Sequence, residues 1–190
     1  MDKISIEIMS GLVWPHITSL VGAESTDRKI NFCAIAWISR VNARPPMIAA
    51  SINPGHLTAE LIAETEQFSV NFPSTKLVAK TDYAGLVTGK KLDKSALFDT
   101  FRGELEHAPM IKACPLVVEC QLVQTIALPS NTLHISEVVG VYADEKIVVN
   151  GVPDPKKLDP ILLTMPDNTY WSLGNPVGKA WSDGKKLKND

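Results

Sequence analysis

The residues best suited to chemistry in this sequence lie in a turn with the sequence SINPGHLT, residues 51–58. The turn follows an apolar run and leads into an expected helix, so several of its backbone amides are free. These amides, the Thr58 hydroxyl and the positive end of the helix dipole together suit a phosphate group. The alternative is an ordinary strand-to-helix turn in which Thr58 only caps the helix.

A second candidate anion site is the basic segment KTDYAGLVTGKKLDK, residues 80–94. Gly85 and Gly89 would let the backbone approach a ligand closely. Thr88 and the lysines, Lys94 among them, offer hydrogen bonds and positive charge to an anion. A solvated basic loop explains the same composition equally well.

Trp37 is the aromatic residue most suited to a flat ligand. It follows the run NFCAIA, residues 31–36, whose small side chains leave backbone groups open to a neighbour. A conjugated ring system needs broad apolar walls and hydrogen bonds at its edge, which such a strand supplies. Burial in the core or in a subunit interface is the competing interpretation.

Signatures of several enzyme classes are absent from the sequence. There is no HExxH, GxSxG, Walker-type glycine loop or GxGxxG after a strand. Cys114 and Cys120 would need two further ligands at matching spacing to bind zinc, so structural thiols are expected. The four histidines are scattered. We therefore predict neither a catalytic side chain nor a metal site.

Apolar runs rich in Val, Ile, Leu, Ala and Thr predict strands at residues 12–21, 32–41, 47–52, 68–72, 116–128 and 132–142. Shorter patterns predict helices at residues 58–64, after a cap at Ser74 or Thr75, and at residues 94–101. Strands this numerous, with few long helices between them, favour a mostly β antiparallel barrel with helical insertions. Residues 150–166 contain four prolines and are expected to form an extended arm or loop.

Composition predicts a single domain over residues 1–190, because 45% of the residues are hydrophobic. A net charge of −2 argues against nucleic acid and anionic membranes as partners. A barrel that binds a peptide or oligonucleotide is disfavoured for the same reason. Three cysteines are an odd number, and neither a signal peptide nor an apolar span is evident. A cytoplasmic protein is the expectation.

Several motifs resemble the flavin reductase-like family, and within it the flavoredoxin type. KTDYAGLVTGKKLDK at residues 80–94 is the most specific of them. The others are NFCAIAW at 31–37, RPPMIAASINPGHLTAELI at 44–62, FSVNFPS at 68–74, CPLVVEC at 114–120 and TLHISEVVG at 132–140. The resemblance covers nearly the whole chain.

This resemblance implies an FMN-binding split β-barrel, a Greek-key antiparallel barrel that forms a homodimer with the flavin near the subunit interface. It places the phosphate at the SINPGHLT turn and the loop ending at Lys94, and the isoalloxazine beside residues 31–37. The implied FMN-binding residues are Asn31, Ala34, Ile35, Ala36, Trp37, Ser51, Ile52, Asn53, Thr58, Thr88, Gly89 and Lys94.

The implied function is that of an oxidoreductase that passes electrons from NAD(P)H or a redox protein through FMN to an acceptor. Two departures from the family bear on it. Many relatives have arginines where Asn53 and His56 stand, and an Asp-His pair where Ser130 and Asn131 stand. The second departure keeps open the alternative of a non-enzymatic FMN-binding electron carrier or flavin-storage protein.

Overall fold

The computed structural model describes residues 3–189, so Met1, Asp2 and Asp190 of the expected domain lie outside the described residues. The strands are β1 (His16–Ile17), β2 (Ser19–Glu24), β3 (Ile30–Ile35), β4 (Ile38–Asn42), β5 (Met47–Ile52), β6 (Gln67–Phe72), β7 (Thr100–Phe101), β8 (Met110–Ile111), β9 (Leu116–Ala127), β10 (Thr132–Ala143), β11 (Val148–Val149), β12 (Val152–Pro153), β13 (Ile161–Thr164) and β14 (Thr169–Ser172). The α-helices are α1 (Ile8–Gly11), α2 (Leu57–Thr65), α3 (Val78–Leu86) and α4 (Pro155–Leu158). The 3₁₀ helices are η1 (Thr75–Leu77), η2 (Ser95–Leu97), η3 (Glu145–Ile147) and η4 (Asp183–Asn189).

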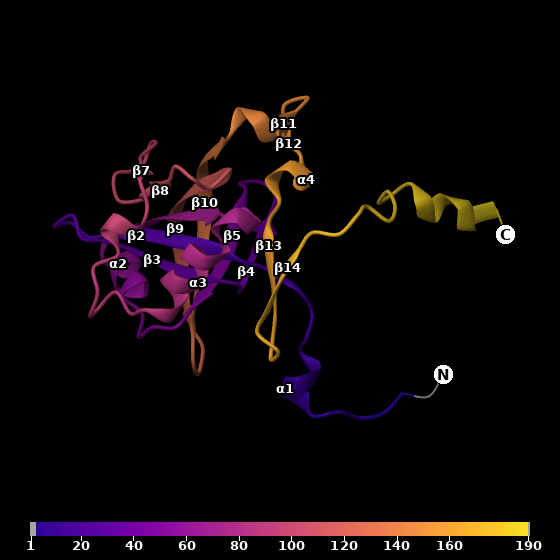
Figure 1. The fold of residues 1–190 in the computed structure, drawn as a ribbon, viewed down its shortest axis with the longest axis horizontal. Coiled ribbons are helices and arrows are strands. Elements are labelled where there is room, and N and C mark those ends of the chain that lie inside the picture. Colours follow the sequence, from indigo (N-terminus) through magenta and orange to yellow (C-terminus); the bar gives the residue numbers. More distant parts are fainter. Residues whose placement is uncertain (1–2, 190) are drawn as a thin grey trace.

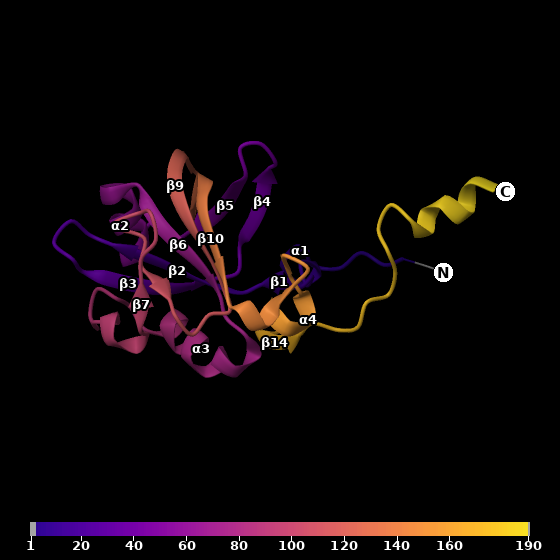
Figure 2. The same ribbon diagram turned by 90° about the horizontal axis from the view of Figure 1, so that it is seen from above.

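Seven strands form one curled antiparallel sheet in the order β3-β2-β6-β9-β10-β5-β4 (Figures 1 and 2). Its edge strands, β3 and β4, follow each other in the chain and are joined by Ala36 and Trp37. They do not pair with each other, so the sheet stays open along one seam. This mostly β architecture with helical insertions confirms the fold class predicted from the sequence.

Side chains alternate between the two faces of the sheet, and each face carries its own buried cluster. Val21 belongs to the cluster that includes Ile62 of α2, whereas its neighbour Leu20 belongs to the cluster that includes Phe32 and Ala84 of α3. Figure 2 shows α2 and α3 on opposite sides of β2 and β3. Each helix is therefore held by a separate part of the core, and both helices pack against β3.

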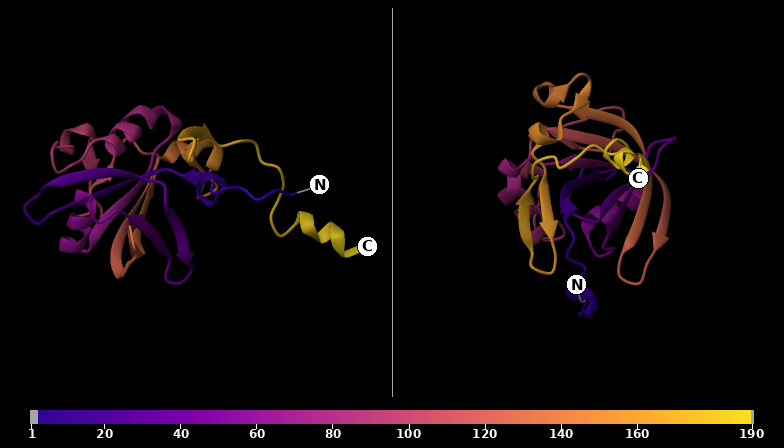
Figure 3. Two further views of the ribbon diagram at one scale, coloured as in Figure 1. Left: turned by 90° about the horizontal axis from the view of Figure 1, so that it is seen from below. Right: turned by 90° about the vertical axis from the view of Figure 1, so that its right-hand side faces the viewer.

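The two ends of the chain project from this body. Residues 3–15 and 173–189 run outward beyond the small sheet formed by β1, β13 and β14 (Figure 3). Trp14, Trp171 and Trp181 are all exposed. No helix in the described part of the chain is long and apolar enough to cross a membrane.

The strand predictions at residues 47–52, 68–72, 116–128 and 132–142 are confirmed by β5, β6, β9 and β10. The prediction for residues 12–21 is wrong over its first half. Leu12 ends α1, and Pro15 has no N–H to donate to a ladder, so pairing begins only at His16.

The predicted strand at residues 32–41 is in fact two strands. Ile38 N donates to Ala36 O at 3.1 Å, and Ser51 N donates to Trp37 O at 2.9 Å. The first bond closes a tight turn, and the second ties this turn to β5 where the chain passes from one edge of the sheet to the other. Sequence alone does not distinguish this turn from a continuous strand, because residues 32–38 on both sides of it are apolar.

Helices α2 and α3 confirm two of the three helix predictions, but the third, at residues 94–101, is wrong. Only η2 is helical there, and Phe98 is extended, with φ −138° and ψ 139°. The Phe98 ring packs edge-on against Phe32 with 5.4 Å between centroids. This core contact outweighs the weak local helix preference.

The expected arm at residues 150–166 is more ordered than predicted, because it contains β12, α4 and β13. The Asp154 carboxylate accepts from the N–H groups of Lys156 and Lys157, and Pro155 occupies the first turn of α4. Proline is compatible with that position because its missing N–H would be unpaired anyway.

Gly22 on β2 provides a test of how tightly the centre of the sheet is packed. A Cβ at this position would lie 2.5 Å from Phe32 Cε1 and 2.7 Å from Pro109 O. We expect Gly22→Ala to lower the free energy of unfolding by about 1–3 kcal/mol through overpacking. Gly174→Ala is the matched control, since a Cβ there meets nothing within 4 Å. Urea unfolding of both variants measures the difference, and equal stabilities would contradict the packing described.

Candidate functional site

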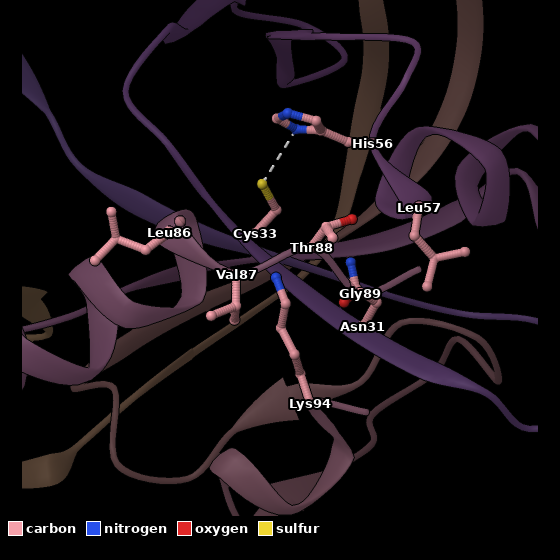
Figure 4. Close-up of a pocket in the computed structure, with 10 residues that line it drawn as sticks. Asn31, Cys33, His56, Leu57, Leu86, Val87, Thr88, Gly89 and Lys94 are labelled. Carbon is pink, nitrogen blue, oxygen red and sulfur yellow. Dashed lines mark hydrogen bonds between the residues drawn. The ribbon is translucent and has the colours of Figure 1, made fainter. Parts of the chain in front are cut away.

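Two adjoining cavities lie at the open seam of the sheet. The first, which we call the Lys94 cavity, measures about 190 Å³ and is lined by Asn31, Cys33, His56, Leu57, Gly85, Leu86, Val87, Thr88, Gly89 and Lys94 (Figure 4). The second, the Trp37 cavity, measures about 340 Å³ and is lined by Ala34, Ile35, Ala36, Trp37, Ser51, Asn53, His56, Asn131, Leu163 and Met165. His56 lines both cavities, so a long ligand could extend from one to the other.

Three parts of the chain form the Lys94 cavity. The edge strand β3 contributes Asn31 and Cys33, which lie two residues apart and therefore point to the same face. The start of α2 contributes His56 and Leu57, and the end of α3 with the segment after it contributes residues 85–89 and Lys94. A Cβ at Gly89 would lie 2.1 Å from Asn31 Oδ1, so the loop reaches β3 this closely only because residue 89 is glycine.

Lys94 gives the first cavity its charge. Its side chain is buried, with 4% of the residue exposed, and its Nζ donates to Phe32 O at 2.9 Å and to Ala84 O at 2.7 Å. Among the described residues, no carboxylate pairs with this ammonium group. Burial lowers the pKa of Lys94, and the nearby Cys33 opposes this. A buried cation with one donor proton left over and no counter-charge favours an anionic ligand.

His56 and Cys33 form the wall opposite Lys94. Cys33 Sγ lies 3.4 Å from His56 Nδ1, and Figure 4 marks this contact with a dashed line. Burial raises the pKa of the Cys33 thiol. Burial, followed by the positive charges of Lys94 and Lys90, lowers the pKa of His56. Both shifts favour the uncharged forms of these two groups, so Lys94 is the lining residue that supplies positive charge to the cavity.

Thr58 does not act as the helix cap considered from the sequence. The N-cap of α2 is His56, and the buried Thr58 hydroxyl accepts from Asn31 Nδ2 at 2.8 Å. Asn31 Oδ1 is buried and has no hydrogen-bond partner among the described residues. An unpartnered buried oxygen costs free energy unless a ligand or water satisfies it. The Asn31 amide is thus a second polar group available to a ligand here.

The structure brings ten of the twelve predicted site residues to these cavities. Asn31, Thr88, Gly89 and Lys94 line the first, and Ala34, Ile35, Ala36, Trp37, Ser51 and Asn53 line the second. Ile52 and Thr58 line neither cavity and are fully buried behind them. The Asn53 side chain accepts from Gly55 N at 2.8 Å, so it shapes the turn that presents His56.

Several lining residues were not among those predicted. Cys33 could have been found from the sequence, because it alternates with Asn31 on the predicted strand. Leu163 and Met165 carry no such signal, since they come from β13 and the segment after it. Only the folding of the C-terminal part against the seam brings them to the Trp37 cavity.

Comparison with known proteins matches this chain to a family model and to solved structures. The family model for the flavin reductase like domain matches residues 11–155. The structure of flavoredoxin from Methanosarcina acetivorans has a TM-score of 0.93 and 48% identity, and the match covers 98% of this chain and 100% of that one. Flavoredoxin of Desulfovibrio vulgaris (Miyazaki F) has a TM-score of 0.87 and 30% identity, with 97% and 99% covered.

An uncharacterized protein of Aeropyrum pernix is 30% identical over 145 residues, which are 75% of this chain and 55% of that protein. The chain therefore spans about half the length of this relative.

The family match covers most of the chain, and the two flavoredoxins share its fold from end to end. These findings confirm the resemblance and the split-barrel fold predicted from the sequence. The chain belongs to the flavin reductase-like family.

Proposed function

We propose that this protein is an FMN-binding oxidoreductase that passes electrons from NAD(P)H or a protein donor through FMN to an acceptor. The observation that carries the proposal is the buried Lys94 ammonium, which has no counter-charge among the residues that the structure describes and lies in a cavity that adjoins an aromatic wall. The similarity to flavoredoxins supports a flavin as the ligand. When bound, FMN supplies the electron-transfer chemistry, and the protein holds and orients it.

The proposed placement puts the phosphate in the Lys94 cavity. Lys94 offers its remaining donor proton, and Thr88 and the backbone at Gly89 complete the wall. Lys90 is already paired with Glu60 at 2.6 Å, so it contributes less to the charge of the cavity. Thr58 acts indirectly, because its hydroxyl holds the Asn31 amide in place.

The isoalloxazine ring is assigned to the Trp37 cavity. Residues 34–36 offer backbone groups and small side chains, and Trp37 offers a flat apolar surface. Ser51 and Asn53 provide polar groups on the opposite strand and turn. No side chain in this arrangement needs to act as a general acid or base.

One observation favours the alternative of a non-enzymatic electron carrier or flavin-storage protein. Among the described residues that line the Trp37 cavity, none is lysine or arginine. A nicotinamide dinucleotide carries a diphosphate, which proteins usually bind with cations or helix amides. Asn131, where many relatives have histidine, also lines this cavity. A protein donor needs no such cation within the cavity.

An absorbance spectrum of the purified protein tests the proposal, with NADH and then NADPH added under anaerobic conditions. Bleaching of a yellow protein by either nucleotide supports the oxidoreductase. A yellow protein that is bleached only by a reduced redox protein supports the carrier. A colourless protein that FMN cannot reconstitute would exclude both.

We further propose that residues 1–190 form one cytoplasmic domain that assembles as a homodimer. The projecting ends of the chain (Figure 3) support a dimer, because they carry the exposed Trp14 and Trp181, and Trp171 on the adjoining β14 is also exposed. A second copy of the chain would bury them. Sedimentation equilibrium should give twice the chain mass of 20.7 kDa, and a sedimenting monomer would contradict the dimer.

Lys94→Ala tests the phosphate assignment. We expect it to weaken FMN binding by about 1–3 kcal/mol, the usual worth of a charge-assisted hydrogen bond. Fluorescence titration with FMN measures the loss, and circular dichroism checks that the variant folds. Lys91→Ala is the matched control, because Lys91 is exposed and lines neither cavity. Riboflavin, which has no phosphate, should bind both variants alike, and an unchanged FMN affinity in Lys94→Ala removes Lys94 from the site.

His56 should make FMN binding depend on pH. In the free protein its pKa is lowered, and a phosphate dianion beside it would raise that pKa. FMN binding is then accompanied by proton uptake at His56. The protonated imidazole strengthens FMN binding at low pH, and this gain in affinity is lost as the pH rises through the pKa that His56 has in the complex. We expect the Kd of FMN to increase several-fold between about pH 6.5 and pH 8.5.

The controls for this prediction are His56→Gln and riboflavin. The variant cannot take up the proton, and riboflavin lacks the phosphate, so both should show a flat profile over the same range. A pH dependence that is as steep in His56→Gln as in the parent protein would assign the proton to another group.

A further inference from the structure

A third cavity lies at the other end of the sheet. It measures about 480 Å³, and we call it the four-lysine cavity because Lys76, Lys146, Lys156 and Lys157 line it. The remaining lining residues are Ser74, Leu77, Ala113, Pro115, Asp144 and Asp159. None of these residues lines the Lys94 or Trp37 cavity. The proline-rich segment expected to be an arm forms one of its walls.

Strand β10 separates this cavity from the proposed flavin site. Asn131 precedes β10 and lines the Trp37 cavity, whereas Asp144 follows β10 and lines the four-lysine cavity. Figure 1 shows β11, β12 and α4 above the sheet and the turn between β9 and β10 below it. A strand of 12 residues at 3.3 Å per residue spans roughly 35–40 Å. A small occupant of this cavity therefore does not touch the flavin site.

The wall formed by residues 145–160 is fixed to the rest of the protein. Thr75 N donates to Asp159 O at 2.9 Å, and the Thr75 hydroxyl donates to the Asp159 carboxylate. Ser74 and Pro160 form an isolated bridge. Asp154 N donates to Ile147 O at 2.8 Å. The lysines of η3 and α4 are thus carried on an anchored backbone opposite Lys76 of η1.

The charges in the cavity do not cancel. Four ammonium groups and two carboxylates leave a surplus of two positive charges, in a chain whose net charge is −2. Lys146 pairs with Asp144 at 2.8 Å, and Lys156 Nζ donates to Leu173 O at 3.4 Å. Lys76 and Lys157 have no ion pair or side-chain hydrogen bond within the described part of the chain.

We propose that the four-lysine cavity is a second anion site, which binds a small molecule that carries a phosphate monoester or diphosphate group. Two unpaired ammonium groups match two negative charges, and lysine acts as a point-charge ligand for phosphate. A volume of 480 Å³ falls within the usual range of small-molecule pockets. This site does not depend on the proposed flavin function.

The test is a titration of the isotope-labelled protein with inorganic pyrophosphate, followed by backbone amide shifts at constant ionic strength. Shifts at residues 74–77, 144–147 and 154–159 should saturate together. They should saturate equally in Lys94→Ala, because Lys94 lines the other anion site and does not line the four-lysine cavity. This comparison separates the two sites even if the protein fails to bind FMN.

Lys76→Ala/Lys157→Ala should weaken pyrophosphate binding at these residues by about tenfold. Lys29→Ala/Lys185→Ala is the matched control, since it removes the same charge from exposed positions outside the cavity. The control should leave the affinity unchanged. The proposal is overturned if the shifts do not saturate, or if both double variants weaken pyrophosphate binding equally. Either result would mean that pyrophosphate responds only to general surface charge.

Discussion

The buried ammonium group of Lys94 is the interaction on which the functional part of this structure depends. It donates to Phe32 O on β3 and to Ala84 O on α3, so one side chain ties the edge strand to the helix that covers it. Desolvating a cation is costly, and two carbonyl bonds offset only part of that cost. The same group therefore stabilises the local fold and leaves a cavity that favours an anion.

The open seam of the sheet supplies the second requirement for a site. Strands β3 and β4 lie at opposite edges of the sheet although they follow each other in the chain, so Ala36 and Trp37 must cross between them. At this crossing the backbone does not form a continuous ladder of hydrogen bonds with a neighbouring strand, and the Trp37 cavity lies there. A closed barrel would pair these strands and leave no such space.

The two ends of the sheet differ in how they present positive charge. At the seam, one lysine is buried and already oriented by hydrogen bonds. At the far end, several lysines are exposed around a larger cavity. Buried charges are screened by salt much less than exposed ones, so anion binding at the far end should depend more strongly on ionic strength.

The sequence by itself predicted the main strands of the large sheet, and β5 to the residue, because strand patterns follow neighbouring residues. The expected site residues came instead from the resemblance to the flavin reductase-like family, and ten of those twelve residues line the two cavities. The tertiary structure decided the rest. The crossing at Trp37, the extended Phe98 and the arrival of Met165 at the cavity all depend on contacts between segments distant in sequence. Such contacts leave no local pattern, and they can override local propensity.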